Sequence, residues 1–568
     1  MVQDAGKLLD RFKAHLGTNY APTEVEVAEL KRILHEPDAQ IRALDEQIGQ
    51  KEAELEELRK RREALVHSTR GPRALLSPIR RIPQDILQEI LLACLPGERY
   101  PTMSADEPPM LLTRISSHWR QVAHRTPRLW DAIHIPAPST ALFIDDPVSD
   151  TEAMANITDK RIGAVNAWLS RSGACPLSIS LWERHSAHDH TYFVRFLTEC
   201  LIPVCFRWKD VTFASSEKGL NPVKHLTKAQ TPLLDSLHLS LTNSALLSIA
   251  SPNASWADFG ILGSQRLTSL SMCSPDVPWK AIRWEQLTTF SLNRETMHWN
   301  EIGYCSIEDL KSALREARAL ISCTLQIRIR LEWDDISNPL DTGELPIELP
   351  SLQNLTIDDY EGISVLPFLR TPCLYSLSYA SILSIPRISH SPSLLRYLQL
   401  NPGVDIHEFS TDDSSLSIEH LVPCLELLPA LRVLHIIPRP PIMMLRNSVK
   451  PLDDELLTLL TPSESPLGAR QTLCPNIEDV EFAHETNMSE AAVVNWIRKK
   501  QTSEDIRVKK LRNVKLAFAK KKPKGRDITA DLQSYVDAGL KVELKYRPVN
   551  YRDLTSLYEG LPSGLARR

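Results

Sequence analysis

A short apolar motif that recurs ten times constrains the fold of this chain more than any other feature of its sequence. Each copy has apolar residues at its first, fourth and sixth positions. The last two are two residues apart, as one face of a β-strand requires, and helical patterns precede several copies. A β and α unit this small cannot close its own core, so we expect the copies to stack as a solenoid. The copies begin at Trp208, Leu234, Leu267, Leu287, Leu352, Leu374, Leu395, Leu431, Ile477 and Leu511.

The intervals between the copies are uneven, ranging from 20 to 65 residues, which predicts helices of unequal size and long loops. The widest interval holds the alternating segment 325–331, which we interpret as an off-pattern strand. A helix over residues 162–169, a stop at Gly173 and a strand over 177–181 form an earlier unit of the same kind. An ordinary α/β domain with buried parallel strands is the alternative that this pattern leaves open.

The residues between the buried positions of each copy would form the exposed face of the stacked strands. They are mostly small and neutral, which suits a flat protein surface better than a charged ligand. A solvated sheet face without a partner fits the same residues. The candidate target-binding residues on this face are Ser236, His238, Ser269, Ser271, Thr289, Ser291, Asn354, Thr356, Tyr397, Gln399, His435 and Glu481.

Helices are predicted before residue 75. Thr23 and Glu26 have the spacing of a capping box at a helix start, and Pro37 is expected to interrupt that helix. We expect a second helix to end near His67, before the break at Gly71–Pro72.

The second helix has the pattern of a coiled coil. From Ile41 to Leu65 core positions alternate three and four residues apart among charged neighbours, although Lys51 and Arg62 occupy two of these positions. A homodimer or a zipper with a partner is one interpretation. A single charged helix folded back onto the body is the other.

Residues 82–130 predict two short helices that pack together. Pro83 suits the first turn of a helix, and the apolar residues that follow lie on one helical face until Pro96–Gly97 ends it. After a loop with several prolines, a second apolar stripe runs from Leu111 to Ala123, and the segment closes on Trp130. Helices this short are marginal in water without a packing partner, so both must be packed.

This arrangement resembles the F-box, although the loop from Pro96 to Pro109 is longer than an F-box usually carries between these helices. The resemblance implies docking on a Skp-type adaptor and, through it, on a cullin-RING ubiquitin ligase. A plain helical hairpin within a larger domain is the alternative. The residues that carry the resemblance, and would build the adaptor-binding module, are Ile82, Pro83, Ile86, Leu87, Ile90, Leu91, Leu111, Ile115, Trp119, Leu129 and Trp130.

The motif copies in turn resemble degenerate leucine-rich repeats, and an F-box followed by such repeats resembles a class of fungal F-box-like proteins. The implied fold is α/β: a coiled-coil helix, a small helical F-box module and an irregular leucine-rich-repeat solenoid. The expected parts are an N-terminal helical segment (1–36), the coiled-coil helix (38–70), the F-box-like domain (75–135), a linker (136–160) and the solenoid (161–568).

The implied function is that of a substrate-recognition subunit, which holds an unknown target protein beside the ligase and has no active site of its own. A coiled-coil and repeat scaffold without a ubiquitin link is the alternative. No nucleophile elbow, phosphate loop or zinc-protease motif occurs, so we predict neither an enzyme nor a cofactor.

Composition adds further expectations. A net charge of −5 over 568 residues favours neither a nucleic-acid partner nor a membrane surface. Ten scattered cysteines predict no disulfide framework, and the cluster of His185, His188 and His190 lacks a second ligand pair, so no metal site is predicted. Without a secretory signal or an apolar span, we expect a cytoplasmic protein. The basic run 498–526 suggests the nucleus as a second location.

Overall fold

The computed structural model describes residues 13–15, 17–76, 78–137, 147–183, 190–241, 259–273, 277–293, 304–326, 328–329, 345–359, 364–381, 393–412, 416, 418–437, 453–462, 472–518 and 528–546. It divides into two compact units, Met1–Glu89 and Ile90–Arg568. The boundary between them falls inside helix α3 (Gln84–Ala93).

The first unit is dominated by one helix, α2 (Glu24–Leu75). At 52 residues it is about 78 Å long, given a rise of about 1.5 Å per residue. The capping box predicted at its start is present, because the Glu26 carboxylate accepts a hydrogen bond of 2.8 Å from the Thr23 backbone N–H. The short 3₁₀ helices η1 (Lys13–His15) and η2 (Pro78–Arg81) precede and follow it in the sequence.

The continuity of α2 corrects two predictions, because Pro37 does not interrupt it and Gly71–Pro72 does not break it. A proline inside a helix removes one backbone hydrogen bond and costs about 3 kcal/mol. Both prolines are exposed, so water can hydrate the carbonyl that each leaves without a donor. Around Pro37 the good helix formers Leu34, Glu36 and Ala39 favour continuing the helix.

The predicted second helix of residues 82–130 is in fact two. Helix α3 (Gln84–Ala93) follows Pro83, as predicted. The stripe from Leu111 to Ala123 is divided between α4 (Leu112–Ile115) and α5 (Ser117–His124). Ser116 separates them because its backbone is extended and its hydroxyl accepts a 3.1 Å hydrogen bond from the Trp119 N–H, which caps α5. The turn η3 (Pro127–Leu129) then leads into the first strand.

Among the described residues of the second unit, a parallel sheet of 14 strands follows these helices. Its spatial order follows the chain order, and every neighbouring pair is parallel. A doubly wound α/β domain would instead reverse its strand order at a switch point, so this topology is that of a stacked repeat. The strands are β1 (Ala132–Pro136), β2 (Leu177–Trp182), β3 (Trp208–Ser215), β4 (Ser236–Leu241), β5 (Ser269–Cys273), β6 (Thr289–Leu292), β8 (Ser322–Gln326), β11 (Asn354–Asp359), β13 (Ser376–Ser381), β14 (Glu408–Thr411), β15 (Val433–Ile436), β16 (Asp479–Thr486), β17 (Asn513–Phe518) and β18 (Lys541–Tyr546).

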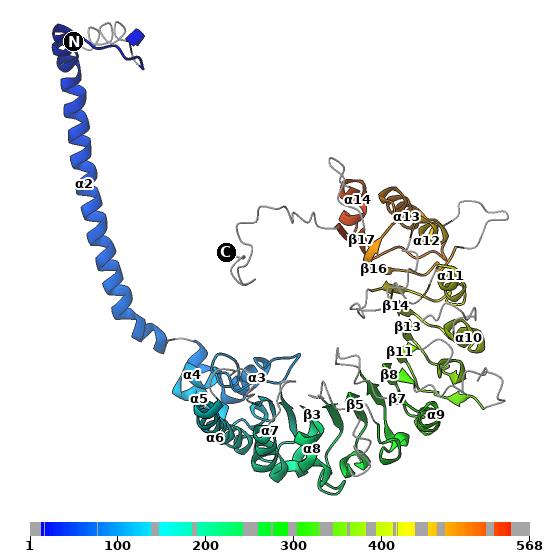
Figure 1. The fold of residues 1–568 in the computed structure, drawn as a ribbon. Coiled ribbons are helices and arrows are strands. Elements are labelled where there is room, and N and C mark those ends of the chain that lie inside the picture. The colour runs from blue at the N-terminus through cyan, green and yellow to red at the C-terminus, as the bar shows by residue number, and fades with distance from the viewer. Residues whose placement is uncertain are drawn as a thin grey trace. The chain divides into compact units, whose positions relative to one another are not determined.

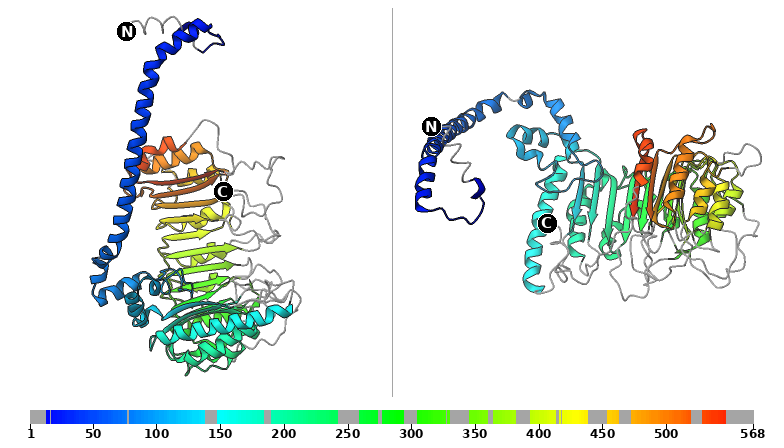
Figure 2. Two further views of the ribbon diagram at one scale, coloured as in Figure 1. Left: turned by 90° about the vertical axis from the view of Figure 1, so that its left-hand side faces the viewer. Right: turned by 90° about the horizontal axis from the view of Figure 1, so that it is seen from above.

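Helices connect the strands and cover one face of the sheet, while the other face lines the inner side of its curve (Figure 1). Figure 2 shows the strands stacked in succession beside this helical layer. Two small pairs, β7 (Tyr304–Cys305) with β9 (Arg328–Ile329) and β10 (Ile347–Glu348) with β12 (Leu369–Arg370), lie outside the main sheet. The remaining helices are α6 (Pro147–Arg171), α7 (Thr191–Phe196), α8 (Glu217–Lys224), α9 (Ile307–Glu316), α10 (Ser393–Leu400), α11 (Ile418–Glu426), α12 (Asp454–Leu460), α13 (Glu490–Thr502) and α14 (Ile528–Asp537), with short helical turns at 197–201, 202–207, 260–263, 279–281, 284–286 and 366–368.

The core lies between the sheet and the helices, and the repeated motif supplies it. In copy after copy the three apolar positions are buried, as with Leu234, Leu237 and Leu239. Nine of the ten copies coincide with strands. The single off-pattern strand predicted over 325–331 is confirmed only in part, because β8 of the main sheet ends at Gln326 and β9 pairs with β7 outside that sheet. The chain is therefore α/β, with a long N-terminal helix and a many-stranded parallel sheet.

The copy at Leu395 is the exception, because it forms α10 and the strand of that repeat is β14. Spacings of three and then two residues suit a helix turn as well as a strand, and here a buried face of Leu394, Tyr397 and Leu398 favours the helix. The linker predicted at 136–160 is also wrong in part, since α6 begins at Pro147 and runs through to Arg171. The stop predicted after it is present, with Gly173 in the left-handed region at φ 56°.

Candidate interaction surfaces

Helix α3 has one buried and one exposed apolar face. Leu87 and Leu91, which are one turn apart, are fully buried. Ile86 and Ile90, also one turn apart, are 50% and 37% exposed. Successive residues are about 100° apart on an α-helix, so the two pairs form adjacent stripes. A buried stripe holds a helix in its fold, whereas an exposed isoleucine pair leaves apolar surface for a partner.

The structure separates the eleven predicted adaptor-binding residues into three groups. Four of them cannot contact an adaptor in this conformation, because their side chains are at most 1% exposed. These four residues stabilise the fold, and only the other seven could contact an adaptor. The exposed group is Pro83, Ile86, Ile90, Leu111 and Ile115; the half-buried group is Ile82 and Trp119; the buried group is Leu87, Leu91, Leu129 and Trp130.

Trp130 joins α5 to the first repeat. Its indole Nε1 donates a 2.9 Å hydrogen bond to the carbonyl of Ala123, near the end of α5. Its ring meets that of Trp168 on α6 edge to face, with centroids 4.9 Å apart, and the Arg171 guanidinium lies 4.7 Å from its centroid. Strand β1 begins two residues later. No flexible linker therefore separates α5 from the sheet.

The long loop between α3 and α4 also binds the repeats. The Tyr100 hydroxyl donates a 2.5 Å hydrogen bond to the Asp210 carboxylate on β3, and burial raises the pKa of Tyr100. One residue further on, the Pro101 carbonyl accepts a 2.8 Å hydrogen bond from the His134 N–H on β1. The segment between α3 and α4, called the insert below, thus lies against the first strands of the sheet.

Glu107 fixes the conformation of this insert. Its carboxylate pairs with the Arg99 guanidinium at 2.5 Å and accepts a 2.5 Å hydrogen bond from the Thr102 N–H. The hydrogen bond from Arg99 and those from Thr102 lower the pKa of Glu107 to about 2. The turn that presents Tyr100 to Asp210 is therefore held by a charged pair across its base.

The inner face of the sheet is built from two rows of polar side chains in register. One row runs from Asp210 through Ser236 and Ser269, and the second runs from Thr212 through His238 and Ser271. Most members are half-buried, because neighbouring strands lie only about 4.8 Å apart. Ten of the twelve predicted target-binding residues lie in these rows: Ser236, His238, Ser269, Ser271, Thr289, Ser291, Asn354, Thr356, His435 and Glu481.

Tyr397 and Gln399 are the two that do not, because both lie on α10. Tyr397 is fully buried, and its hydroxyl is hydrogen-bonded to Thr371. Their places in the rows are taken by Glu408 and Ser410 of β14, which pair with Ser376 and Ser378. The sequence prediction missed these two because β14 lacks the full apolar motif.

Charged residues lie on the inner face toward both of its ends, with Asp210 on β3 at one end and Glu408, Asp479, Glu481 and Lys515 from β14 onward. His435 Nε2 lies 3.4 Å from Asp479, and the Asn513 amide donates to the same carboxylate at 3.1 Å. Lys515 Nζ lies 3.2 Å from Glu481, and this pair raises the pKa of Lys515. From β4 to β13 the rows are instead composed of hydroxyls, His238 and Asn354.

His190, predicted only as one of three clustered histidines, belongs to a buried network with Glu183 and Ser216. His190 Nδ1 lies 2.9 Å from the Glu183 carboxylate and Nε2 lies 2.8 Å from the Ser216 hydroxyl. Serine, histidine and a carboxylate in this order form catalytic triads. Here Ser216 is only 7% exposed and accepts the Gly219 N–H as the cap of α8, so the network joins the end of β2 to a helix start. No sequence spacing indicates it.

The expectations about a metal site, a membrane span and the basic run can be compared with the structure only over the described residues. No cluster of three metal-ligating side chains occurs among the described residues, and His185 and His188 lie outside them. Within the same residues no helix is long and apolar enough to cross a membrane. The end of the basic run, from residue 519 onward, also lies outside the described residues.

Comparison with known proteins leaves the family of this chain open. No protein-family model matches it, and no curated protein matches its sequence. Among solved structures, a chain of the crystal structure of the Rad7 and Elc1 complex in yeast is 12% identical to it. That match covers 75% of this chain and 94% of the other at a TM-score of 0.29. A likeness this distant carries no argument about function.

Proposed function

We propose that this chain is the substrate-recognition subunit of a Skp-cullin-F-box type ubiquitin ligase. The observation that carries the proposal is α3, which leaves Ile86 and Ile90 in water beside the buried Leu87 and Leu91. A helix that packed only within its own chain would place its isoleucines inward. The exposed pair lies within the order of residues that resembles an F-box, and a Skp-type adaptor is the partner that this resemblance implies.

The chain would act by proximity rather than by chemistry of its own. Holding a target beside a conjugating enzyme turns a bimolecular encounter into an effectively intramolecular one. Such a device gains from a stiff connection between its two binding surfaces. Trp130, the contact of Tyr100 with Asp210 and the direct passage into β1 provide that stiffness between residues 100–130 and the sheet.

The inner face from β4 to β13 is the proposed target-binding surface. Its side chains are short, neutral and held in register, so a protein partner could cover them without desolvating a charge. Serine and threonine hydroxyls can both donate and accept hydrogen bonds, which suits a protein backbone laid across the strands.

The test is calorimetry on the full chain with a purified Skp-type adaptor. We expect binding in the submicromolar range that is lost in Ile86→Asp and in Ile90→Asp, because each places a charge in the middle of the contact. Ile506→Asp is the matched control, since Ile506 is 92% exposed and lies between α13 and β17. Circular dichroism of each variant verifies that α3 and the repeats remain folded.

A wild-type chain that does not bind the adaptor, or variants that bind it as tightly as the wild type, would contradict the proposal. The second candidate function would then be a protein-interaction scaffold without a ubiquitin link. The observation that favours this alternative is α2, which carries a long apolar seam outside the module.

A further inference from the structure

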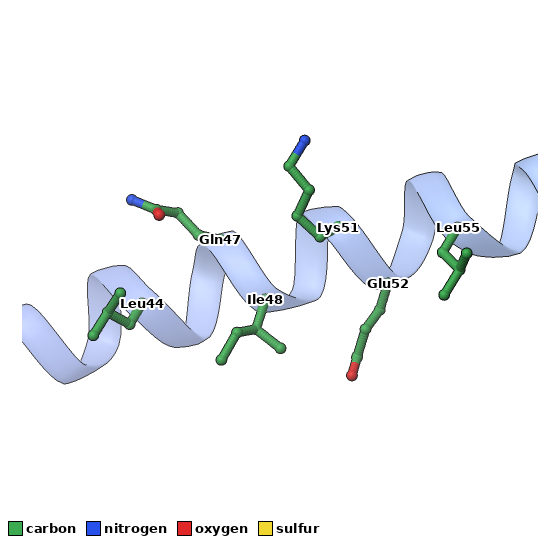
Figure 3. A pocket seen from close by; sticks show the side chains of 6 residues that line it. All are labelled: Leu44, Gln47, Ile48, Lys51, Glu52 and Leu55. Atoms are coloured by element: carbon green, nitrogen blue, oxygen red, sulfur yellow. The ribbon is translucent and has the colours of Figure 1, made fainter.

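The seam of α2 leaves six large apolar side chains about half exposed. A shallow groove follows its middle, lined by Leu44, Gln47, Ile48, Lys51, Glu52 and Leu55. In Figure 3, Ile48 and Glu52 point to one side of the helix and Gln47 and Lys51 to the other. The exposed fractions of the seam are 54% for Ile41, 57% for Leu44, 53% for Ile48, 47% for Leu55, 60% for Leu58 and 59% for Leu65.

The charge of α2 changes sign along its length. Residues 36–57 contain eight acidic and two basic side chains, whereas residues 58–73 contain six basic and one acidic. A helix that is acidic in one half and basic in the other complements a second copy of itself only when the two run in opposite directions. In a parallel pair the basic runs 59–62 of both copies would lie side by side.

We propose that α2 pairs with α2 of a second copy of this chain as an antiparallel coiled coil centred on residue 53. Each core residue of one helix then faces the core residue of the other helix for which the two residue numbers add up to 106. Ile41 faces Leu65, Ile48 faces Leu58, and both polar core residues face leucines. Lys51 lies opposite Leu55, and Arg62 lies opposite Leu44. A parallel pair would instead place Lys51 against Lys51 and Arg62 against Arg62.

The flanking charges support the same register. Asp45 on the edge of one seam lies beside Arg59 of the other, twice in each dimer. Moving one helix by a heptad in one direction places Lys51 against Arg62. Moving it in the other direction places Arg62 against Pro37 and Asp45 beside Glu52. Residue 53 is therefore the alignment that pairs all eight core positions and keeps Lys51 away from Arg62, with Glu52 and Glu54 each beside its own copy at the dimer axis.

The seam is large enough for a stable pair. Each half-exposed isoleucine or leucine offers about 100 Å² of apolar surface, so six in each of two copies contribute about 1,200 Å², the lower end of a standard protein interface. Lys51 and Arg62 add their aliphatic stems while their charges reach the edge. Lys51 already does this, since its Nζ lies 2.7 Å from Glu54.

The first test is the mass of the full chain in solution by light scattering over a range of concentrations. We expect twice the single-chain mass of 64.2 kDa, falling toward the single-chain value in Leu55→Asp, which places a charge against the aliphatic stem of Lys51 in the apolar seam. Leu345→Asp is the matched control, because Leu345 is 79% exposed and lies in the other unit. A wild-type mass of one chain at every concentration would overturn the proposal, whether or not an adaptor binds.

The second test establishes direction by disulfide cross-linking of full-length Ile48→Cys and Leu58→Cys. Residues 48 and 58 face each other only in the antiparallel register, so a mixture of the two variants should cross-link under oxidation. Each variant alone should show no more product than the wild type, whose exposed Cys94 and Cys373 set the background. Cross-linking of each variant with itself would show a parallel pair and refute the antiparallel register.

Discussion

The hydrogen bond between Tyr100 and Asp210 provides a sharp test of how the insert is attached to the repeats. Tyr100→Phe removes the hydroxyl and keeps the ring. A hydrogen bond to a charged acceptor contributes about 1.5–3 kcal/mol. At about 2 kcal/mol, the insert should open about 30 times more often, because 1.4 kcal/mol corresponds to a factor of ten. Burial raises the pKa of Tyr100, so the hydroxyl remains a donor at neutral pH.

Hydrogen exchange measures this opening directly. The amide of Thr102 is bonded to Glu107, and that of His134 is bonded to Pro101. Both amides should lose protection together, because the insert holds both bonds. Tyr375→Phe is the control. Tyr375 is 44% exposed and immediately precedes β13, which is many strands away from β3 in the sheet. It should leave both amides unchanged.

A double-mutant cycle decides whether the loss comes from this bond. In the Asp210→Ala background, Tyr100→Phe should change the exchange of Thr102 and His134 by less than threefold, because its acceptor is already gone. If Tyr100→Phe costs as much in that background as in the wild type, the two groups are not coupled. The Tyr100 hydroxyl would then act through a group other than Asp210, and the hydrogen bond of Pro101 with His134 would remain as the contact between the insert and β1.

Two further predictions concern buried groups of the array. Trp130→Ala should lower the free energy of unfolding in urea by about 4 kcal/mol. Trp130→Phe should lower it by about 1 kcal/mol, because the Ala123 carbonyl loses the indole donor and keeps only its bond from the Thr126 N–H. Phe206→Ala, with a ring 56% exposed, should cost under about 1 kcal/mol, and a Trp130→Phe variant as stable as the wild type would contradict the role of the indole N–H. Lys500 donates to the carbonyls of Pro475, Ile477 and Lys509, and burial lowers its pKa to about 8. The unfolded chain, with a lysine pKa of about 10.4, binds this proton more tightly, so the unfolding free energy should rise between about pH 8 and pH 10.4, by up to about 3 kcal/mol. That rise should be absent from urea unfolding of Lys500→Met, and an identical pH dependence in the two proteins would refute it.

The periodic part of the fold could be predicted from the sequence. The repeated motif ends in two apolar residues that are two positions apart, which predicts the buried face of a strand. Nine of the ten copies form such a strand. The copy at Leu395 failed because its spacing fits a helix equally well. Strand β14 was missed because Thr411 stands where the motif has its last apolar residue. Strand β18 was missed because none of its residues is buried and it is defined by its backbone pairing with β17. Pro37 and Pro72 were predicted to interrupt the helix and do not. An exposed helix tolerates prolines because water can hydrate the carbonyl that loses its donor.

The candidate surfaces were only partly predictable. Helical periodicity identified the apolar residues of α3, but Ile86 and Leu87 have the same chemistry and only the packing distinguishes the exposed residue from the buried one. The contact of Tyr100 with Asp210 joins positions 110 residues apart, and no local pattern records it. The network of His190 with Glu183 and Ser216 is missed for the same reason, because it depends on the parallel placement of β2 beside β3.

The distribution of charge on the inner face limits which of its strands a target protein would contact at the lowest desolvation cost. At its first strands the carboxylate of Asp210 is already bonded by Tyr100. At its last strands Asp479 and Glu481 are bonded by His435, Asn513 and Lys515. A partner at either end would have to displace bonds that these groups already make, at a cost of about 1–3 kcal/mol for each charge left without its partner. From β4 to β13 the two rows contain no charged side chain to displace. Contacts there would cost the least desolvation, which favours the strands from β4 to β13 as the surface on which a protein partner lies.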